Sequence, residues 1–384
     1  MKNFPSKPGR AVFLVFLFCY IFWGIYTELR FIEIKPLPQW LHEDFSYYEN
    51  ALKLAREDKN FYADRSIGTG FLYPPPALII IELFAQIPSI ARVSLFTTLN
   101  ITLLLLMIYF TAKKYGYSIE DTWWWYILGV GFAPFLELLH IGQINMITLF
   151  AVSMMFIYEK SKPEISGLWL SLGVITKVTP LIFTIYLLAI RNFKAIISLG
   201  IGVILFGVLA AIRYGWEPLL QYPAVFRWLT SVFPMGDNSQ SLMAKLFALG
   251  WISRESAPAW QQVLSGYLLL IIAISSALTI VNKTREPLFL ILSLGVLFSQ
   301  NVLWYHHYVF ILLPLFVWMA WSRLHPLVVF WCLLGLSIIQ LDRHGLTHGL
   351  LILVFGHASI LAILLLQSIK AYPALKQMRI IPLH

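Results

Sequence analysis

The stretch AIISLGIGVILFGVLAAI, residues 195–212, decides the fold class of this chain. It carries no charged residue, and its length approaches the roughly 20 residues with which an α-helix crosses the hydrocarbon core of a bilayer. Similar apolar runs recur along the whole sequence of 384 residues, of which 59% are hydrophobic and 12% charged. A soluble globular chain carries about a quarter charged residues. The sequence therefore predicts an all-α polytopic integral membrane protein whose single membrane-embedded domain covers residues 1–384.

Apolar runs of this kind mark the expected membrane spans, and we predict a bundle of about 10 to 13 transmembrane helices. The candidate spans are residues 11–29, 76–88, 91–112, 123–139, 143–158, 165–190, 195–212, 262–281, 287–303, 308–321, 326–341 and 349–369. Two long segments separate them, a first loop over residues 30–75 and a second over 213–261. Loops of this length usually carry a function.

The basic residues orient this arrangement in the membrane. The net charge of +9 comes from short Lys and Arg clusters between apolar runs, which is typical of topology signals rather than of a nucleic-acid surface. Lys and Arg at both ends predict cytoplasmic termini in a cell (inner) membrane, with both long loops extracytoplasmic. The scheme leaves Lys113, Lys114, Lys160 and Lys162 outside, so we expect some short spans in that half to be re-entrant or miscounted.

The first long loop contains DFSYYENALKLA, residues 44–55. Its apolar residues fall on one helical face, which predicts an amphipathic helix on the membrane surface. Asp44 begins this helix, where it could act as a base toward a substrate arriving from the membrane interface. It could equally be the helix cap, a role that Asp often takes. On position alone, we favour the cap.

Two further groups of residues suit the binding of an anionic, sugar-bearing ligand. The segment Trp304-Tyr305-His306-His307-Tyr308 combines two imidazoles with aromatic rings where a predicted span ends, although an interfacial aromatic belt explains it equally well. Lys177 lies in the apolar run VITKVTPLIF. An intramembrane cation indicates a functional site, here for a phosphate, unless the lysine extends to an interface.

Weaker signals complete the set of candidates. His140 and Gln143 are spaced to share a helical face, with Asn145 close by. Asn238-Ser239-Gln240-Ser241 could bind sugar hydroxyls or form an ordinary turn. The carboxylates of Glu82 and Glu137 are buried candidates for which helix packing is at least as good an explanation. No cluster has a convincing metal-ligand spacing, so we expect neither a metal nor another cofactor.

In order, these motifs resemble the membrane mannosyltransferases that use polyprenol-phosphate-mannose, grouped as glycosyltransferase family 87 in the GT-C superfamily. The motifs are Asp44-x-x-Tyr47-Tyr48, Tyr73-Pro74-Pro75, Gly142-Gln143-x-Asn145, Gly167 with Lys177-x-x-Pro180, Gln240-Ser241-Leu242 and Trp304-x-His306-His307. Two positions depart from the family pattern, which often has Asn-Gln-Ser near Ser239 and Ser-Pro at Ser299-Gln300.

The resemblance implies a GT-C bundle with its active site outside the cytoplasm, between the first long loop and the membrane. It implies that Asp44 is the base of an inverting hexosyl transfer, which makes that role more probable than the cap. The implied binding residues for a polyprenyl-phosphate-sugar donor and a glycolipid or polysaccharide acceptor are Tyr48, Tyr73, Gln143, Asn145, Lys177, Gln240, Trp304, His306 and His307. Arg65, Arg213 and Arg227 are further candidates for the departing phosphate.

The residues alone leave two other functions open. A transporter or flippase for a lipid-linked sugar would also need a polar path and a buried cation such as Lys177. A polysaccharide polymerase or ligase would share the external loops but take an oligosaccharide donor. The polar candidates gather toward one side of the membrane, which favours an enzyme.

Overall fold

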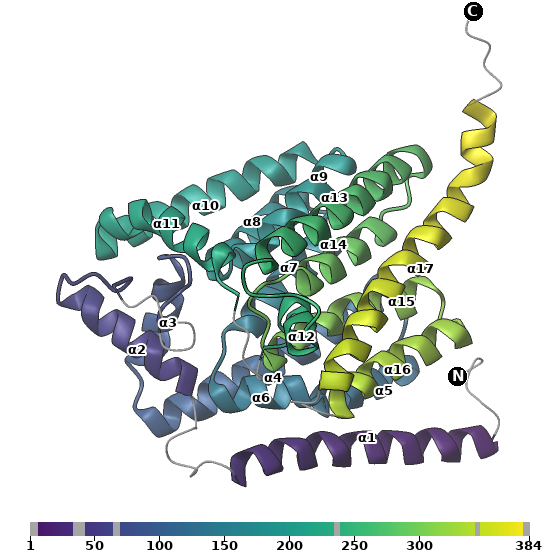
Figure 1. Ribbon diagram of the computed structural model, residues 1–384, viewed down its shortest axis with the longest axis horizontal. Coiled ribbons are helices and arrows are strands. Elements are labelled where there is room, and N and C mark those ends of the chain that lie inside the picture. The colour runs from purple at the N-terminus through teal and green to yellow at the C-terminus, as the bar shows by residue number, and fades with distance from the viewer. Residues whose placement is uncertain (1–6, 34–42, 64–69, 234–238, 342–345, 379–384) are drawn as a thin grey trace, which may run out of the picture.

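A computed structural model describes residues 7–33, 43–63, 70–233, 239–341 and 346–378 (Figure 1). Every regular element in these ranges is helical. The elements are α1 Lys7–Glu33, α2 Glu43–Arg56, α3 Ala77–Ala85, α4 Ser89–Lys114, α5 Ile119–Val130, α6 Ala133–Ile141, α7 Asn145–Tyr158, α8 Pro163–Thr176, η2 Thr179–Ile182, α9 Phe183–Ala189, α10 Phe193–Tyr214, α11 Glu217–Ser231, α12 Leu242–Ala248, α13 Ala257–Asn282, α14 Glu286–Phe298, η3 Tyr305–Ile311, α15 Leu312–Trp321, α16 Pro326–Leu341 and α17 Leu346–Met378.

The helices confirm an all-α polytopic membrane protein. Within the described ranges five of them, in α1, α4, α10, α13 and α17, are long and apolar enough to cross a bilayer. Helices α5 and α6 reach that length only as a pair bent by 56°, which is the geometry of a broken span or of a re-entrant loop. Shorter apolar helices fill the space between them. In Figure 1 α1 and α10 run roughly along the long axis of the molecule, α17 crosses it steeply, and α2, α3 and α11 gather at one end.

One predicted span is wrong. The run at residues 76–88 forms only α3, a helix of 9 residues. At 1.5 Å per residue such a helix covers less than half of the hydrocarbon thickness. The prolines before it, Pro74 to Pro76, begin this short helix instead of leading into a span.

A second predicted span, residues 165–190, is a hairpin of two legs. The first leg, α8, ends at Thr176, because the backbone of Lys177 is extended (φ −159°, ψ 127°) and Pro180 follows shortly after. The second leg, η2 and α9, runs back to the level at which the first began. There Asn192 Nδ2 donates to the carbonyl oxygen of Glu159, 2.8 Å away, and the Tyr186 hydroxyl bonds the Glu159 carboxylate.

The helix ends around Glu159 lie on one face of the protein. Lys114 at the end of α4 and Arg285 before α14 lie 3.5 and 3.7 Å from the buried Glu159 carboxylate. Arg323 after α15 donates to the carbonyl oxygen of Tyr115 at 3.4 Å. The turns that follow α4, α7, α9, α13 and α15 therefore share this end, which we call the basic face.

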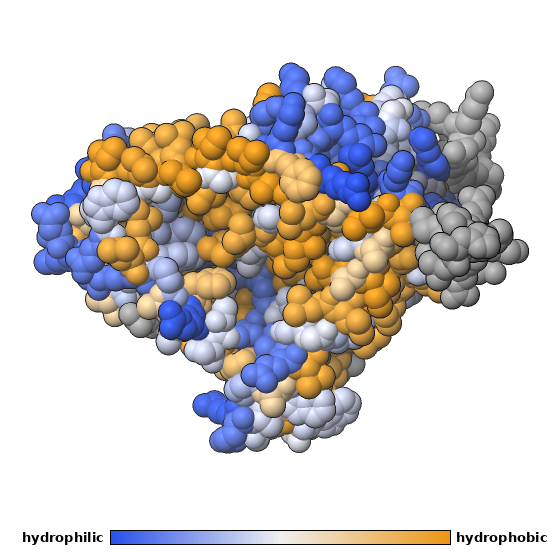
Figure 2. Space-filling view, turned by 90° about the horizontal axis from the view of Figure 1, so that it is seen from above, coloured by the Kyte–Doolittle hydropathy of each residue, from blue (hydrophilic) through white to orange (hydrophobic). Residues whose placement is uncertain are grey.

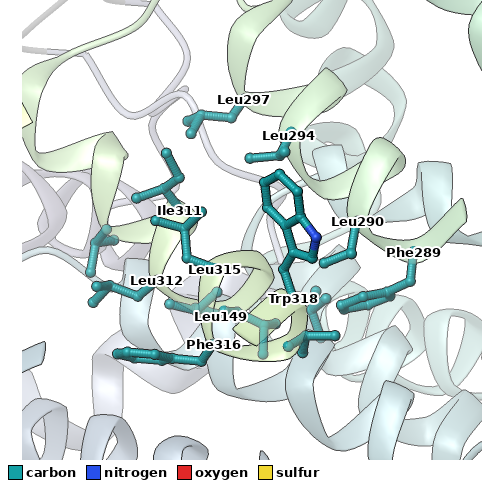
Figure 3. Packing of buried hydrophobic residues seen from close by; sticks show 14 of the residues in the cluster. Leu149, Phe289, Leu290, Leu294, Leu297, Ile311, Leu312, Leu315, Phe316 and Trp318 are labelled. Carbon is teal, nitrogen blue, oxygen red and sulfur yellow. The ribbon is translucent and has the colours of Figure 1, made fainter. Parts of the chain in front are cut away.

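The centre of the bundle is packed by apolar side chains from α7, α14, η3 and α15 (Figure 3). Trp318 lies among Leu149, Phe289, Leu290 and Leu294, each no more than 3% exposed. Lipid tails are as apolar as these residues, so close van der Waals contact rather than exclusion of water stabilises this core. The short helices around the core are thereby held at fixed depths.

The bend between α5 and α6 frees backbone groups inside the membrane, and Gln340 of α16 pairs with them. Its Oε1 accepts from the Ala133 N–H at 3.4 Å, and its Nε2 donates to the Gly131 carbonyl oxygen at 3.1 Å. The same Nε2 also bonds the Tyr20 carbonyl oxygen of α1. One buried amide thus joins three segments and fixes the direction of α6.

Helices α8 and α10 approach closely through small residues. A Cβ atom added at Gly167 would lie 2.1 Å from the Ala195 carbonyl oxygen, and one at Gly202 would lie 2.2 Å from Ser171 Oγ. Small residues at helix contacts are typical of membrane proteins, because they allow the backbones to approach. On the same helix, Gly200 has open space around it.

This difference gives a test of the helix packing. We expect Gly202→Leu to lower the thermal unfolding midpoint in detergent clearly below that of Gly200→Leu, since overpacking costs about 1–3 kcal/mol. Both changes have the same effect on helix propensity in α10 and both add one leucine. Equal midpoints for the two variants would contradict the close packing of α8 on α10.

Candidate active site

A cavity of about 670 Å³ lies among the ends of the short helices. Its walls come from α2, the segment after α6, the α8–η2 break, α11, α13 and the segment from Ser299 to His307. Figure 2 looks onto the side of the molecule that carries α10, α11 and α13, whose surface is largely hydrophobic with a hollow near its middle. Hydrophilic residues are visible inside this hollow.

One wall centres on Asp44, in the first turn of α2. Gln143 Nε2 donates to Asp44 Oδ2, while Gln143 Oε1 accepts from the hydroxyls of Tyr48 at 3.1 Å and Tyr73 at 2.9 Å. The two tyrosine hydroxyls, 3.2 Å apart, orient the amide so that its NH₂ faces Asp44. The structure thus brings four predicted site residues into one network.

The environment of Asp44 makes its carboxyl group unusually basic. Burial, and after it the negative charges of Glu43 and Glu137, together raise its pKa to about 8. A base is most effective when its pKa lies near the working pH. The carboxylate is bonded to Gln143, and none of the described residues offers it a backbone N–H, so the helix-cap interpretation is not supported.

Ion pairs fix the helix that carries Asp44 at both ends. Near its start, Arg92 of α4 pairs with Glu49 and lies 4.8 Å over the ring of Phe45. Near its end, Arg56 Nη2 lies 3.1 Å from Glu82 Oε1. Arg213 also bonds Glu82, so the arginine predicted to bind phosphate instead has a structural partner.

A second group of lining residues carries the nitrogen groups. Lys177 Nζ lies 3.2 Å from His307 Nε2, and His307 Nδ1 accepts from the backbone N–H of Trp304 at 3.3 Å. A neutral imidazole that accepts at Nδ1 carries its proton on Nε2. Lys177 Nζ and His307 Nε2 therefore lie side by side at the cavity, where both can donate N–H groups to one anionic oxygen.

Both histidines line the cavity, with their rings 4.6 Å apart and nearly perpendicular. His306 Nδ1 lies 3.7 Å from Glu137 Oε1 of α6. Glu137 also lines the cavity, a position for which its sequence context gives no specific signal. The aromatic residues Tyr222 and Phe226 of α11 are further lining residues that were not predicted, although the length of the second loop indicated a function there.

Several predicted residues lie elsewhere. Asn145 is fully buried at the start of α7, and Gln240 is held by its backbone, which donates to Leu303 O at 2.7 Å; neither lines the cavity. Gly142, in the left-handed conformation (φ 75°), ends α6, so His140 and Gln143 do not share a helical face. His140 instead pairs with Glu28 of α1 at 2.7 Å.

Three other candidate residues are not among the described residues that line the cavity. Arg227 is exposed on α11 and is not among the lining residues. Arg65 and Asn238 lie outside the described residues. The cavity is therefore lined by the network of Asp44, Tyr48, Tyr73 and Gln143 and by Lys177, Trp304, His306 and His307.

Comparison with known proteins assigns the family. The model of glycosyltransferase family 87 matches residues 71–304, more than half of the chain. The polyprenol-phosphate-mannose-dependent alpha-(1-2)-phosphatidylinositol mannoside mannosyltransferase of Mycobacterium tuberculosis is 24% identical over 311 residues, which cover 73% of this chain and 69% of that protein. No solved structure matches the chain. This chain is a multi-pass membrane glycosyltransferase that belongs to glycosyltransferase family 87.

Proposed function

We propose that the protein transfers a hexosyl group, which we take to be mannose, from a polyprenyl-phosphate-sugar donor to a glycolipid or polysaccharide acceptor. The carrying observation is that a half-buried carboxylate, Asp44, and a pair of nitrogen donors, Lys177 and His307, line the same cavity. The similar mycobacterial protein is named for its use of polyprenol-phosphate-mannose, which supports the donor, and for a phosphatidylinositol mannoside acceptor, which makes a glycolipid the first class to test.

The charges fit an inverting displacement. The acceptor hydroxyl oxygen forms the new bond to the anomeric carbon, and its proton passes to the Asp44 carboxylate. The bond between that carbon and the phosphate oxygen breaks, and its electron pair leaves with the polyprenyl phosphate. A phosphate is a good leaving group, so one carboxylate is enough, whereas glycosidases pair two. Lys177 and His307 would stabilise the charge that develops on the phosphate, without a metal ion.

A lipid-linked donor also suits the surroundings of the cavity. Its wall includes Ile182 of η2 and Phe226 and Leu229 of α11. The surface on that side of the molecule is hydrophobic around the hollow (Figure 2). A prenyl chain could remain in the membrane while its phosphate reaches Lys177. A flippase would instead need a path through the bundle, and the polar residues here converge on one cavity.

We propose further that the cavity opens on the extracytoplasmic side and that both termini are cytoplasmic. Helix α3 is not counted as a membrane span, and residues 165–190 form a hairpin that begins and ends on the same side. The basic face then carries Lys113, Lys114, Lys160, Lys162, Arg191, Lys194, Lys283, Arg285 and Arg323. The positive-inside rule then holds in both halves of the chain and makes the basic face cytoplasmic.

Sugar transfer from radiolabelled polyprenyl-phosphate-mannose to a membrane lipid extract tests the reaction. We expect labelled glycolipid with the wild type, and a rate at least about 100-fold lower for Asp44→Asn, because a general base contributes roughly 10²–10⁴-fold. Asp58→Asn is the matched control, since Asp58 is exposed just beyond the same helix, and its rate should not change. A folded Asp44→Asn enzyme with wild-type turnover would exclude Asp44 as the base.

The pH dependence tests the environment of Asp44. The carboxyl acts as a base only when deprotonated, so kcat/KM should rise with pH and level off above an apparent pKa of about 8. The charged groups that contribute are Glu43 on the same helix and Glu137 on α6, with His306 beyond it. A rising limb near the ordinary value for Asp, about 4, would show that the carboxyl is not buried as described.

Cysteine labelling tests the sidedness. In a variant without Cys19 and Cys332, we expect a membrane-impermeant maleimide to label Lys59→Cys in intact cells. It should label Lys160→Cys and Lys283→Cys only after permeabilisation. Labelling of Lys160→Cys from outside would reverse the proposed orientation of the basic face.

A further inference from the structure

Glu137 has no role in the transfer as described so far, yet it lies close to His306 and acts electrostatically on Asp44. Its side chain is 10% exposed, lines the cavity and lies 3.7 Å from His306 Nδ1, while its charge also acts on Asp44. A carboxylate at this depth is costly unless it has a charged or hydrogen-bonded partner. His306, with a side chain 8% exposed, is such a partner.

The two adjacent histidines thereby differ in their surroundings. His307 lies against the Lys177 ammonium and accepts a backbone hydrogen bond, whereas His306 lies against a carboxylate. A proton on His306 Nδ1 faces Glu137, so the ring is held by its Nδ1 edge. This geometry makes His306 suited to carry a positive charge, and His307 suited to remain a neutral donor.

We infer that Glu137 is a positioning residue that holds His306 as the cationic partner of the donor phosphate. This inference rests on the proposed function, since it names the device by which that site recognises the phosphate of its donor. Glu137 would touch neither the sugar nor the phosphate. It would act through the imidazole, with Lys177 and His307 completing the anion-binding wall.

The test separates donor binding from turnover. We expect Glu137→Gln, which keeps the side-chain shape but removes the charge, to raise KM for polyprenyl-phosphate-mannose roughly tenfold, with a smaller change in kcat. Glu137→Asp keeps a carboxylate and should recover part of the affinity. The double variant Glu137→Gln with His306→Asn should bind no worse than His306→Asn alone, because the two residues act as one unit.

A binding measurement keeps the two proposals distinguishable. Polyprenyl phosphate, with unphosphorylated polyprenol as the comparison, is titrated against the full-length protein in nanodiscs. If the wild type does not discriminate between them, the proposed donor itself is wrong. If the wild type does, but Glu137→Gln binds the phosphate equally well with unchanged KM, the positioning role is overturned.

Glu159→Gln provides the control for structural damage. Glu159 is also a buried glutamate with cationic partners, but it lies at the basic face and does not line the cavity. Its loss could lower the thermal midpoint, whereas KM of the folded fraction should not change. Equal increases in KM for Glu137→Gln and Glu159→Gln would show a general loss of structure and would overturn the inference.

Discussion

Backbone that leaves a helix inside a bilayer has no water with which to form hydrogen bonds, so it occurs only where protein or a hydrated cavity surrounds it. This constraint explains where the site lies. Helix α6 ends at Ile141, α8 at Thr176 and α14 at Phe298, and the segments that follow these ends supply Gln143, Lys177 and Trp304 to one cavity. The backbone groups that these three helix ends leave unpaired require a polar cavity beside them. The side chains of the segments that follow the ends then determine which ligand the cavity can bind.

The positive and negative side chains of the site come from different parts of the structure. The cationic wall comes from inside the bundle, where an isolated Lys177 would be costly without a polar cavity beside it. The base comes from α2, which reaches the cavity from outside the spans and is held there by the Arg92–Glu49 pair and by Glu82. Asp44 and Lys177 therefore reach the cavity from different elements, and the structure shows no ion pair between these two residues.

Much of this arrangement could be predicted from the sequence, because helical periodicity and residue chemistry are local. The amphipathic pattern after Asp44 predicted α2, and the motifs around Tyr73, Gln143 and His306 supplied residues that the fold brings together. The hairpin at residues 165–190 was not predicted, since the apolar run continues through Lys177. Pro180 was its main local signal.

Other features depend on contacts that a single sequence does not reveal. Glu137 meets His306 only through the packing of α6 against η3. Asn145 and Gln240 have the polar side chains of a site, yet they are enclosed by neighbouring segments. The short α3 was mistaken for a span because its apolar run, at residues 76–88, is extended by residues beyond the helix.

The amide of Gln340 has a consequence for the order in which the enzyme is made. The bend between α5 and α6 is synthesised early, but the side chain that pairs with Gly131 and Ala133 belongs to α16, close to the end of the chain. Until α16 has entered the membrane, these backbone groups lack their partner and the direction of α6 is not fixed. A ribosome-bound chain that has not yet reached α16 thus holds every residue that lines the cavity but lacks the amide that fixes the direction of α6.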